Sequence, residues 1–378
     1  MHDRRATAAT LGLCLAASQA ALLILTPILT SVAADFGVST AVAGQLRTVS
    51  GLTAGLTAVL SGLLAARVGL RELVIGGVGL LAVGSGLSAV APDFVVLALA
   101  QVPIGIGVGL TYSAAVAAVA EWSRPEDRSR MLAVALLGPP LAWVVGMPLG
   151  GAAGEVSWRL SWIVVPFVLS LAGLVALSRR RRTPPADVAA GLRTVLEQPA
   201  VVRWSLGELL AYSGWLGVLV FIGALFVEVH GLSVAATGLA LGAAAAMYVP
   251  GNLLFRRWVD GHNRLLLVTL ALACSLVTAA LGAVRTNAWT SFALFGALAF
   301  LAGGRTLAGG ARGLNLAPAL RLGVTGLRTA ALQFGSFVGA AVGGAALAWG
   351  GFTAAGLAFG GLFAAAAVPH LRATTLAE

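Results

Sequence analysis

One acidic side chain lies inside a long apolar stretch, where an ionised group is costly to keep. Glu208 stands about five residues into the apolar run that starts at residue 204. Ionisable groups in such surroundings usually serve a function, so Glu208 is our candidate for taking up a proton on one side and releasing it on the other. The alternative is an interfacial glutamate that pairs with Arg203 or with water.

Basic side chains near the ends of other apolar runs provide candidate partners. Arg305 and Arg328 lie towards the ends of two later runs, where each could extend to an aqueous interface or receive a carboxylate such as that of Glu208. Asp35 follows the first run, and Arg47 lies about six residues into the second. An ion pair between Asp35 and Arg47 is one interpretation, and separate solvation of the two is the other.

Histidines, cysteines and acidic residues do not gather at spacings that would build a catalytic or metal site. Cys14 and Cys274 lie in separate apolar runs, where a free thiol packs as a small apolar group. We predict no catalytic residue, no metal and no cofactor. The chain has no lysine, and no phosphate-binding loop of the Gly-x-x-x-x-Gly-Lys-Ser/Thr type, so the sequence excludes ATP hydrolysis by this chain.

The composition predicts a membrane protein. Hydrophobic residues make up 59% of the chain and charged residues 10%, and the mean hydropathy is +0.95. Too few polar side chains remain to cover a water-soluble surface. The net charge of +10 arises from arginines in short gaps between apolar runs, so we predict contact with the lipid bilayer and none with nucleic acid. No segment points to an obligatory protein partner.

The apolar runs are long enough to cross a bilayer as helices. A crossing helix needs about 20 residues, because about 30 Å of hydrocarbon is spanned at about 1.5 Å per residue. Strands of a barrel would instead alternate polar and apolar residues. The sequence predicts twelve spans, at residues 7–33, 41–65, 73–91, 94–119, 131–153, 160–178, 204–227, 234–254, 264–284, 288–311, 324–348 and 353–371.

The arginines also predict the orientation of these spans. With the amino terminus in the cytoplasm, only Arg47, Arg159 and Arg285 fall near the outer face, as the positive-inside rule requires. Both termini are then cytoplasmic. Between the sixth and seventh spans, the arginine run 179–182 precedes a mildly amphipathic stretch at 186–198, which we predict to be a linker with a short surface helix.

A glycine pattern in the fifth span recurs in the eleventh, 193 residues later. The first copy contains Gly146, Pro148, Gly150 and Gly151, and the second contains Gly339, Gly343 and Gly344. A membrane chain that uses one helix design twice is most simply interpreted as a duplicated transporter. We therefore predict a six-helix bundle at 1–178, a cytoplasmic linker at 179–203 and a second six-helix bundle at 204–378.

A short turn after the second span carries glycines and arginines at regular positions. In this turn the chain resembles the major facilitator superfamily, whose loop between helices 2 and 3 reads Gly-x-Leu-Ala-Asp-Arg-x-Gly-Arg-Lys. Gly62, Arg67 and Gly69 match, Arg71 is a conservative match, and Ala66 replaces the aspartate. The resemblance implies an all-α fold of two pseudo-symmetric six-helix bundles, with a weakened or rerouted cytoplasmic latch. A basic hairpin that only sets topology is the alternative.

Two more motifs extend the resemblance. Gln101 stands where the family carries a helix 4 arginine linked with proton coupling, and it could bond a substrate or hold two helices together. The turn from Gly146 to Gly151 resembles the glycine and proline motif of drug and sugar efflux members, in an arabinose-efflux-like variant. Proline removes a backbone hydrogen bond, so we expect this helix and its repeat to bend during transport, with a static kink as the alternative.

The resemblance also implies a midplane cavity lined mainly by helices 1, 4, 7 and 10. Polar residues on comparable spans, including one on helix 11, are few and mostly uncharged: Ser18, Gln19, Gln101, Tyr112, Tyr212, Trp215 and Gln333. Such a lining favours an apolar or amphipathic solute over a sugar or a highly charged metabolite.

We therefore expect an inner-membrane exporter of small hydrophobic or amphipathic, drug-like compounds that works by alternating access and proton antiport. Its partners would be the small molecule, protons and the bilayer. An uncoupled facilitator or importer stays open, because the family's aspartate and helix 4 arginine are both replaced. A membrane enzyme would need converging ionisable groups, and a sensor would usually add a soluble domain; the sequence offers neither.

Overall fold

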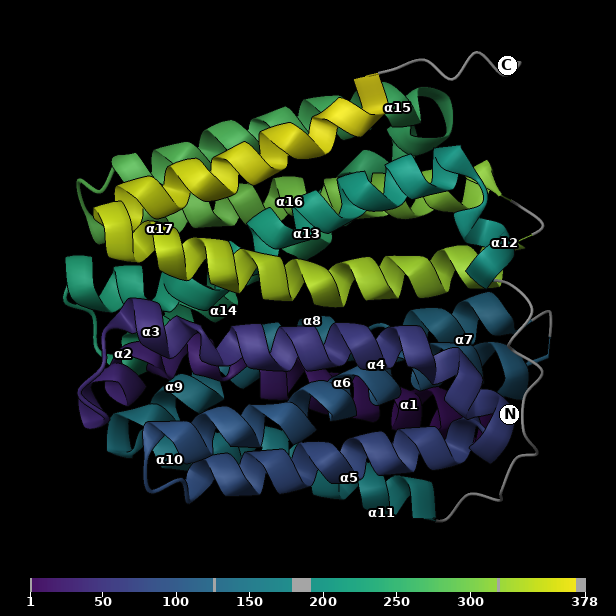
Figure 1. Cartoon of the computed structure of the whole chain (residues 1–378), viewed down its shortest axis with the longest axis horizontal. Helices are drawn as coiled ribbons and strands as arrows, with labels where there is room; N and C mark the ends of the chain where they lie inside the picture. The colour runs from purple at the N-terminus through teal and green to yellow at the C-terminus, as the bar shows by residue number, and fades with distance from the viewer. Residues whose placement is uncertain (1, 125–126, 179–191, 318–319, 372–378) are drawn as a thin grey trace. The chain divides into compact units, whose positions relative to one another are not determined.

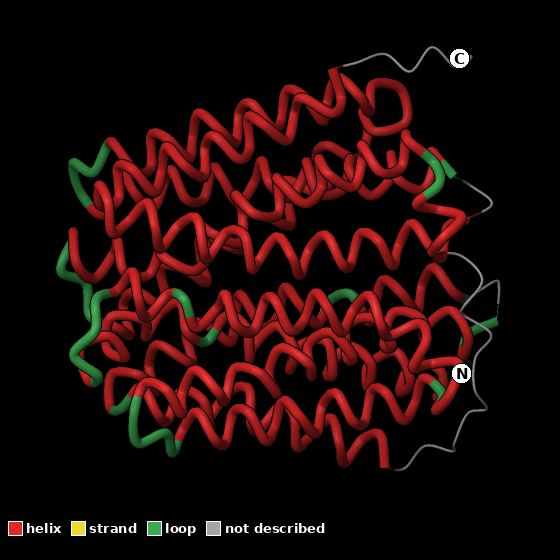
Figure 2. The backbone as a smooth tube through the Cα atoms, in the orientation of Figure 1, coloured by secondary structure: helices red, strands yellow, loops and turns green. Residues whose placement is uncertain are grey.

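The computed structural model describes residues 2–124, 127–178, 192–317 and 320–371. Within these ranges the chain forms helices joined by short connections and contains no strand, as Figures 1 and 2 show. The all-α fold class expected from the apolar runs is confirmed. The arginine run 179–182 and residues 186–191 of the predicted surface helix lie outside the described residues.

The chain divides into two compact units, each of which is described by itself. The first comprises Met1–Ala189 and Ile222–Gly242, and the second comprises Ala190–Phe221 and Ala243–Glu378. The domain boundaries predicted at residues 178 and 204 stay a prediction.

Broken helices are common in the first unit. Its elements are α1 (His2–Leu23), α2 (Leu25–Asp35), α3 (Thr40–Gly44), α4 (Leu46–Val68), α5 (Leu70–Ala89), α6 (Phe94–Trp122), α7 (Arg128–Ala135), α8 (Gly138–Leu141), the π-helix η1 (Ala142–Gly146), α9 (Met147–Val156), α10 (Trp158–Trp162), the π-helix η2 (Ile163–Phe167) and α11 (Val168–Ser178). The end of α13, the π-helix η3 (Leu225–Val229) and most of α14 (Val234–Ala245) also belong to it.

The second unit is built mainly from longer helices. It contains α12 (Leu192–Leu196), most of α13 (Pro199–Ala224), α15 (Tyr248–Ala283), α16 (Ala288–Leu316) and α17 (Arg321–Leu371). The short α12 is the described part of the predicted linker helix. Its Val195 is fully buried against Val201, Trp204 and Val324, so this helix is packed against the bundle.

Eleven segments of the described chain are long and apolar enough to cross a membrane. The last of them, Gly323–Leu371, has 49 residues. At about 1.5 Å per residue it would be more than twice as long as the bilayer core is thick. Helical geometry breaks at Gly350 and Gly351, where φ is −148° and 65°, and Figure 1 shows α17 reversing direction. It therefore holds two crossings, and the predicted total of twelve is reached.

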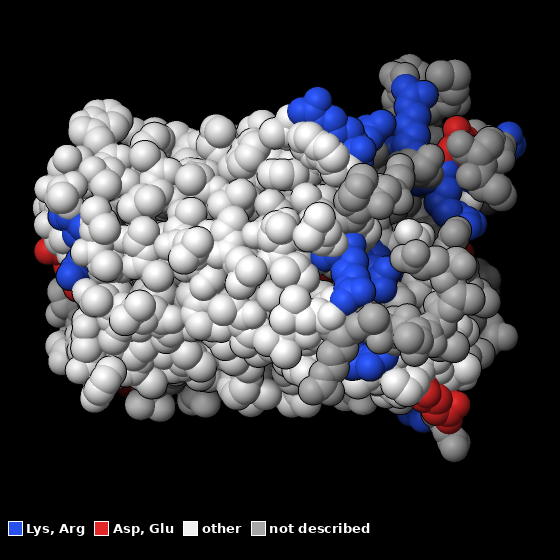
Figure 3. Space-filling model, turned by 90° about the horizontal axis from the view of Figure 1, so that it is seen from above, with Lys and Arg blue, Asp and Glu red and all other residues white. Residues whose placement is uncertain are grey.

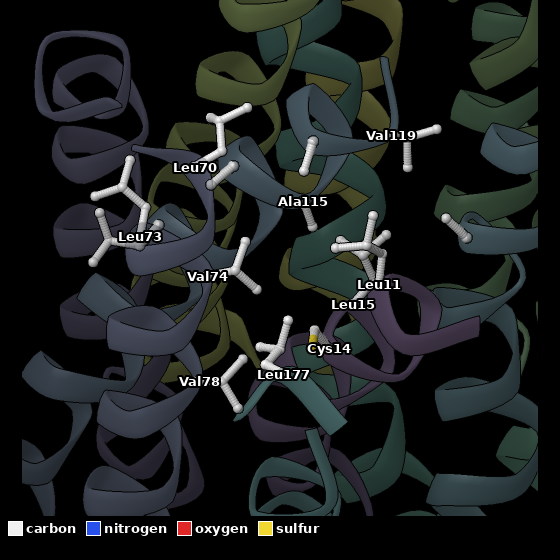
Figure 4. Close-up of a cluster of buried hydrophobic side chains, with 14 of the residues drawn as sticks. Leu11, Cys14, Leu15, Leu70, Leu73, Val74, Val78, Ala115, Val119 and Leu177 are labelled. Carbon is white, nitrogen blue, oxygen red and sulfur yellow. The ribbon is translucent and has the colours of Figure 1, made fainter. Parts of the chain in front are cut away.

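The core of the first unit lies where α1, α5, α6 and α11 meet (Figure 4). Leu11 and Cys14 of α1, Val74 of α5, Ala115 of α6 and Leu177 of α11 are all fully buried there. Cys14 thus packs as a small apolar side chain, as its sequence context predicts.

Uncharged side chains cover the flanks of the helices that face the viewer in Figure 3, and arginines gather near helix ends. Many of the exposed side chains are large and apolar, such as Leu99, Leu253, Leu276 and Trp349. A surface of this kind is suited to lipid rather than to water.

Candidate functional site

Glu208, Arg305 and Arg328 form an ion-pair group in the second unit, here called the Glu208 cluster. Oε1 of Glu208 lies 2.9 Å from Nη2 of Arg305, and Oε2 accepts a 3.0 Å hydrogen bond from Nε of Arg328. The Glu208 side chain is 0% exposed, whereas those of Arg305 and Arg328 are 3% and 26% exposed. The structure therefore buries Glu208 against two arginines and does not place it at an interface with Arg203.

Backbone groups of two helices hold the cluster in place. Nη2 of Arg305 donates to the carbonyl of Gly207 at 2.9 Å, and Nη2 of Arg328 donates to the carbonyl of Thr306. The Glu208 carboxylate packs against Gly309 so closely that a Cβ atom at Gly309 would overlap it. The lack of a side chain on this turn of α16 makes room for the carboxylate.

Aromatic rings follow Glu208 along the same face of α13. Tyr212 comes one helical turn later, and the guanidinium carbon of Arg328 lies 5.9 Å from the centroid of its ring. Trp215, seven residues after Glu208, stacks between Tyr248 and Phe295, with both centroid distances 6.1 Å. The structure thus brings one of the predicted lining residues, Tyr212, against the cluster and places another, Trp215, further along the same face of α13.

The other predicted lining residues are buried or half-buried in the two units. In the first unit, Ser18 donates to the carbonyl of Leu15 at 2.9 Å, and Gln19 is buried and Tyr112 is half-buried. In the second unit, Gln333 is buried, and its Nε2 has no hydrogen-bond partner within the part of the chain that the structure describes. Their role in binding a substrate stays a prediction.

Gln101 joins two helices of the first unit. Its Nε2 lies 3.3 Å from Oγ of Ser88 on α5 and 3.2 Å from the carbonyl of Leu97. Because the side chain is buried and already bonded, this arrangement favours the interpretation of Gln101 as a link between helices.

The ion pair at the other end of the first unit differs from the one suggested by the sequence. Asp35 bonds to Arg159 at 2.7 Å and accepts a 3.0 Å hydrogen bond from Nε1 of Trp158. Arg47 is instead buried and donates to the carbonyl of Leu22. The predicted ion pair between Asp35 and Arg47 is therefore wrong. Asp35 ends α2 beside the start of α10, whereas the side chain of Arg47, near the start of α4, is buried in the bundle.

The glycine and arginine turn joins α4 to α5. Gly69 has a φ of 86°, which residues with a side chain rarely adopt, and so permits the tight reversal. Arg71 bonds to Glu72 at 3.1 Å and to the carbonyl of Leu177 on α11 at 3.2 Å. Arg67 is exposed, and Gly62 borders open space. Arg71 thus fastens the turn to the end of α11, within the first unit.

Both copies of the repeated glycine pattern lie at close helix crossings. A Cβ atom at Gly151 of α9 would contact the backbone of Gly238 on α14, and one at Gly150 would contact Ile24. In α17, Gly339 packs against the backbone of α13 at Ser213 and Gly217. The remaining members of the pattern are Gly146 at the end of η1, Pro148 in the first turn of α9, and the buried Gly343 and Gly344.

Two carboxylates that the sequence pattern does not single out also make contacts between elements of the first unit. Oε2 of Glu155 accepts a 2.8 Å hydrogen bond from the backbone N–H of Ala235 at the start of α14, and Glu228 accepts one from Thr40. Both acids stand near the ends of apolar runs, where charged residues are expected anyway, so the sequence carries no signal for these contacts.

Comparison with known proteins places this architecture among transporters. The profile of the Major Facilitator Superfamily matches residues 11–304. One similar curated protein is the transcription regulatory protein OpdE of Pseudomonas aeruginosa, which is 28% identical over 66% of this chain and 64% of the relative. A probable sugar efflux transporter of Helicobacter acinonychis is 25% identical over 63% of this chain and 61% of the relative. A multidrug resistance protein B homolog of Mycobacterium tuberculosis is 33% identical over 47% of this chain and 34% of the relative. The chain spans less than two thirds of each of these relatives.

Among solved structures, the D-xylose–proton symporter has the same fold. It superposes with a TM-score of 0.75 at 16% identity, over 97% of this chain and 96% of the other. The expected two-bundle fold class is therefore confirmed, while so low an identity leaves the substrate open.

Proposed function

Because the chain belongs to the major facilitator superfamily, we propose that it exports small hydrophobic or amphipathic compounds across the bacterial inner membrane by alternating access, in exchange for protons. Both termini would lie in the cytoplasm. Membership in this family makes the chain a membrane transporter rather than an enzyme. The substrate, the direction and the coupling are the parts that we propose.

One observation carries the coupling, namely the burial of Glu208 between two arginines. Protonation of Glu208 removes its charge and with it the attraction that joins α13 to α16 and α17. A buried pair that loses one charge is destabilised, because the remaining guanidinium groups keep theirs. The cluster would therefore have two states, one for each protonation state of Glu208, as a proton-driven conformational cycle requires.

The sparse polar residues support the proposed substrate class. The predicted lining residues are few and mostly uncharged, and the stack of Trp215, Tyr248 and Phe295 adds aromatic rings on the same helices. Relatives named for sugar efflux and for multidrug resistance support export. Of the two substrate classes that these names suggest, sugars and drug-like compounds, a lining with few polar groups favours the apolar or amphipathic drug-like compound.

The test is transport by the purified chain in proteoliposomes, with a panel of lipophilic compounds and an imposed pH gradient. Glu208→Gln should lose flux driven by the gradient and keep exchange of substrate at equal pH. Glu121→Gln, which removes an exposed carboxylate on α6, is the matched control and should keep both activities. Unchanged driven flux in Glu208→Gln would remove Glu208 from the mechanism, and movement of sugars or amino acids alone would replace the substrate class.

An uncoupled facilitator or importer is the second candidate. It is favoured by Ala66 in the place of the family's aspartate and by the structural role of Gln101 in the place of its arginine. In that case wild-type flux would follow the substrate gradient alone and would not respond to the pH gradient.

A further inference from the structure

The Glu208 cluster contains more positive than negative charge. Two guanidinium groups, which stay protonated in proteins, share one carboxylate, so the cluster carries one surplus positive charge when Glu208 is ionised. A buried charge without a counter-ion is strongly unfavourable, and a second anion beside the arginines would relieve it.

Hydrogen-bond donors of the cluster also outnumber its acceptors. Among the described residues, Nε of Arg305 is buried without an acceptor, on a residue that is 2% exposed, and Oε1 of Glu208 is in ion-pair contact with Arg305 but accepts no hydrogen bond. Arg328 uses Nε for Glu208 and Nη2 for Thr306, and its Nη1 bonds to no acceptor among the described residues. An anion with two or more acceptor oxygens would satisfy donors that the protein leaves open.

Access to the cluster is through Arg328. Its side chain is 26% exposed, whereas Glu208 and Arg305 are 0% and 3% exposed. Charged side chains at membrane depth face the bundle interior or a water-filled space and avoid lipid. Arg328 is therefore the member of the cluster that a solute inside the protein would meet first.

Aromatic side chains begin next to this charge. The buried Tyr212 lies against the Arg328 guanidinium, and the buried Trp215 follows on the same face of α13. Tyr248 stacks on Trp215 and is half-buried, so part of its ring stays accessible. An apolar body could lie on Tyr248 while its charged end reaches Arg328.

We propose that the Glu208 cluster binds the anionic end of the transported compound, whose apolar body packs on the half-buried Tyr248 at the end of the aromatic residues Tyr212 and Trp215. The surplus of one charge matches a monoanion such as an amphipathic carboxylate or sulfonate. This inference rests on the proposed function and narrows its substrate class.

Binding, measured without any gradient, tests the proposal. The purified full chain in nanodiscs is titrated with radiolabelled 4-phenylbutyrate and, in parallel, with 4-phenylbutyramide, which has the same shape and no charge. The carboxylate should bind about 10- to 100-fold more tightly, the effect of a hydrogen-bonded charge. Equal affinities of the two probes would overturn the proposal.

Two variants of the cluster should move this preference in opposite directions. Arg328→Gln leaves one arginine with one carboxylate, a balanced pair that should fold, and it should abolish the preference for the carboxylate. Glu208→Gln raises the surplus charge and should strengthen carboxylate binding while amide binding stays the same. Arg257→Gln, an exposed arginine of α15 that stacks on Trp258, is the matched control and should keep the wild-type preference.

Results opposite to those expected for these variants would contradict the anion site. A full preference in a folded Arg328→Gln protein, or a weaker one in Glu208→Gln, would overturn the site. If Arg328→Gln does not fold, Glu208→Gln alone decides. Displacement of the label by chloride, with no difference between the carboxylate and the amide, would show a site for small inorganic anions and would overturn the organic substrate class.

The binding assay and the flux assay can fail separately. A protein that exports uncharged amphiphiles under a pH gradient but binds both probes equally keeps the proposed function and loses the anion site. A protein that prefers 4-phenylbutyrate but moves no compound across the membrane keeps the anion site and loses the proposed function.

Discussion

At the scale of single residues, a missing side chain is as important for the Glu208 cluster as the charges themselves. The carboxylate of Glu208 packs against Gly309, whose carbonyl accepts a 2.8 Å hydrogen bond from Nε1 of Trp204. Next to it, Gly310 packs against the guanidinium group of Arg328. Two successive glycines of α16 therefore provide the space that the ion pairs need.

Gly309→Ala should disturb the cluster. The added methyl group would overlap the Glu208 carboxylate, which is held by two arginines and cannot move freely. Overpacking of this kind costs about 1–3 kcal/mol of unfolding free energy. We expect a lower thermal midpoint in detergent and reduced flux under a pH gradient.

Gly296→Ala is the matched control for this substitution. It lies in the same helix, and the nearest atom that its Cβ would meet is Cγ of Met247 at 3.8 Å, an ordinary contact. A Gly309→Ala protein as stable and as active as Gly296→Ala would show that the carboxylate has room to shift.

The residues of the cluster could be selected from sequence, but the ion pair of Asp35 could not. Glu208, Arg305 and Arg328 are recognisable because charges are rare and costly inside apolar runs. Asp35 lies at the end of such a run, where charges are common, and its partner depends on which helix ends meet. Its partner Arg159 is 124 residues away, so proximity in sequence wrongly favoured Arg47.

At the scale of elements, hydropathy predicts the spans well because the bilayer sets a length that the chain must meet. It does not predict how helices are interrupted. The π-helices η1, η2 and η3 each shift the helical register by about one residue, and α1 is separated from α2 at Ile24. Such shifts depend on packing against neighbouring helices, and packing leaves no periodic signal in one sequence.

The end of the first crossing in α17 is set by a single glycine. Gly351 has a φ of 65°, and the preceding Gly350 has also left the helical region. With a ψ of −159°, the backbone of Gly351 lies in a region that almost only glycine occupies, and a side chain there costs about 1–3 kcal/mol. Gly351→Ala should therefore lower the free energy of unfolding by about this amount, as measured by denaturation in mixed micelles.

Gly361→Ala shows what alanine does elsewhere in α17. That glycine has ordinary helical geometry and open space around its Cβ position, so the substitution should be neutral or stabilising by up to about 1 kcal/mol. Equal stability of the two variants would contradict the idea that Gly351 is required for the reversal of the chain.

At the scale of the whole molecule, the number and the orientation of the crossings rest on different arguments. The described part of the chain has eleven apolar segments, one of which holds two crossings, so the number of crossings there is even and residues 2 and 371 should lie on the same side of the membrane. The positions of the arginines alone predict which side of the membrane this is. Arg67 at the end of α4 would be cytoplasmic, and Arg285 before α16 would be one of the few near the outer face.

Thiol labelling of intact cells tests this orientation. Cys14 and Cys274 are 0% exposed, so the wild-type chain should give little signal with a membrane-impermeant maleimide. Thr286→Cys, at an exposed position between α15 and α16, should be labelled in intact cells, because the positive-inside rule places this connection outside. Arg67→Cys, exposed beside the turn between α4 and α5, should be labelled only after the membrane is permeabilised. The reverse labelling pattern would mean that the orientation in the membrane is opposite to the one predicted, and the side from which a compound enters for export would change with it. Labelling of both positions in intact cells would contradict the predicted odd number of crossings between residues 67 and 286.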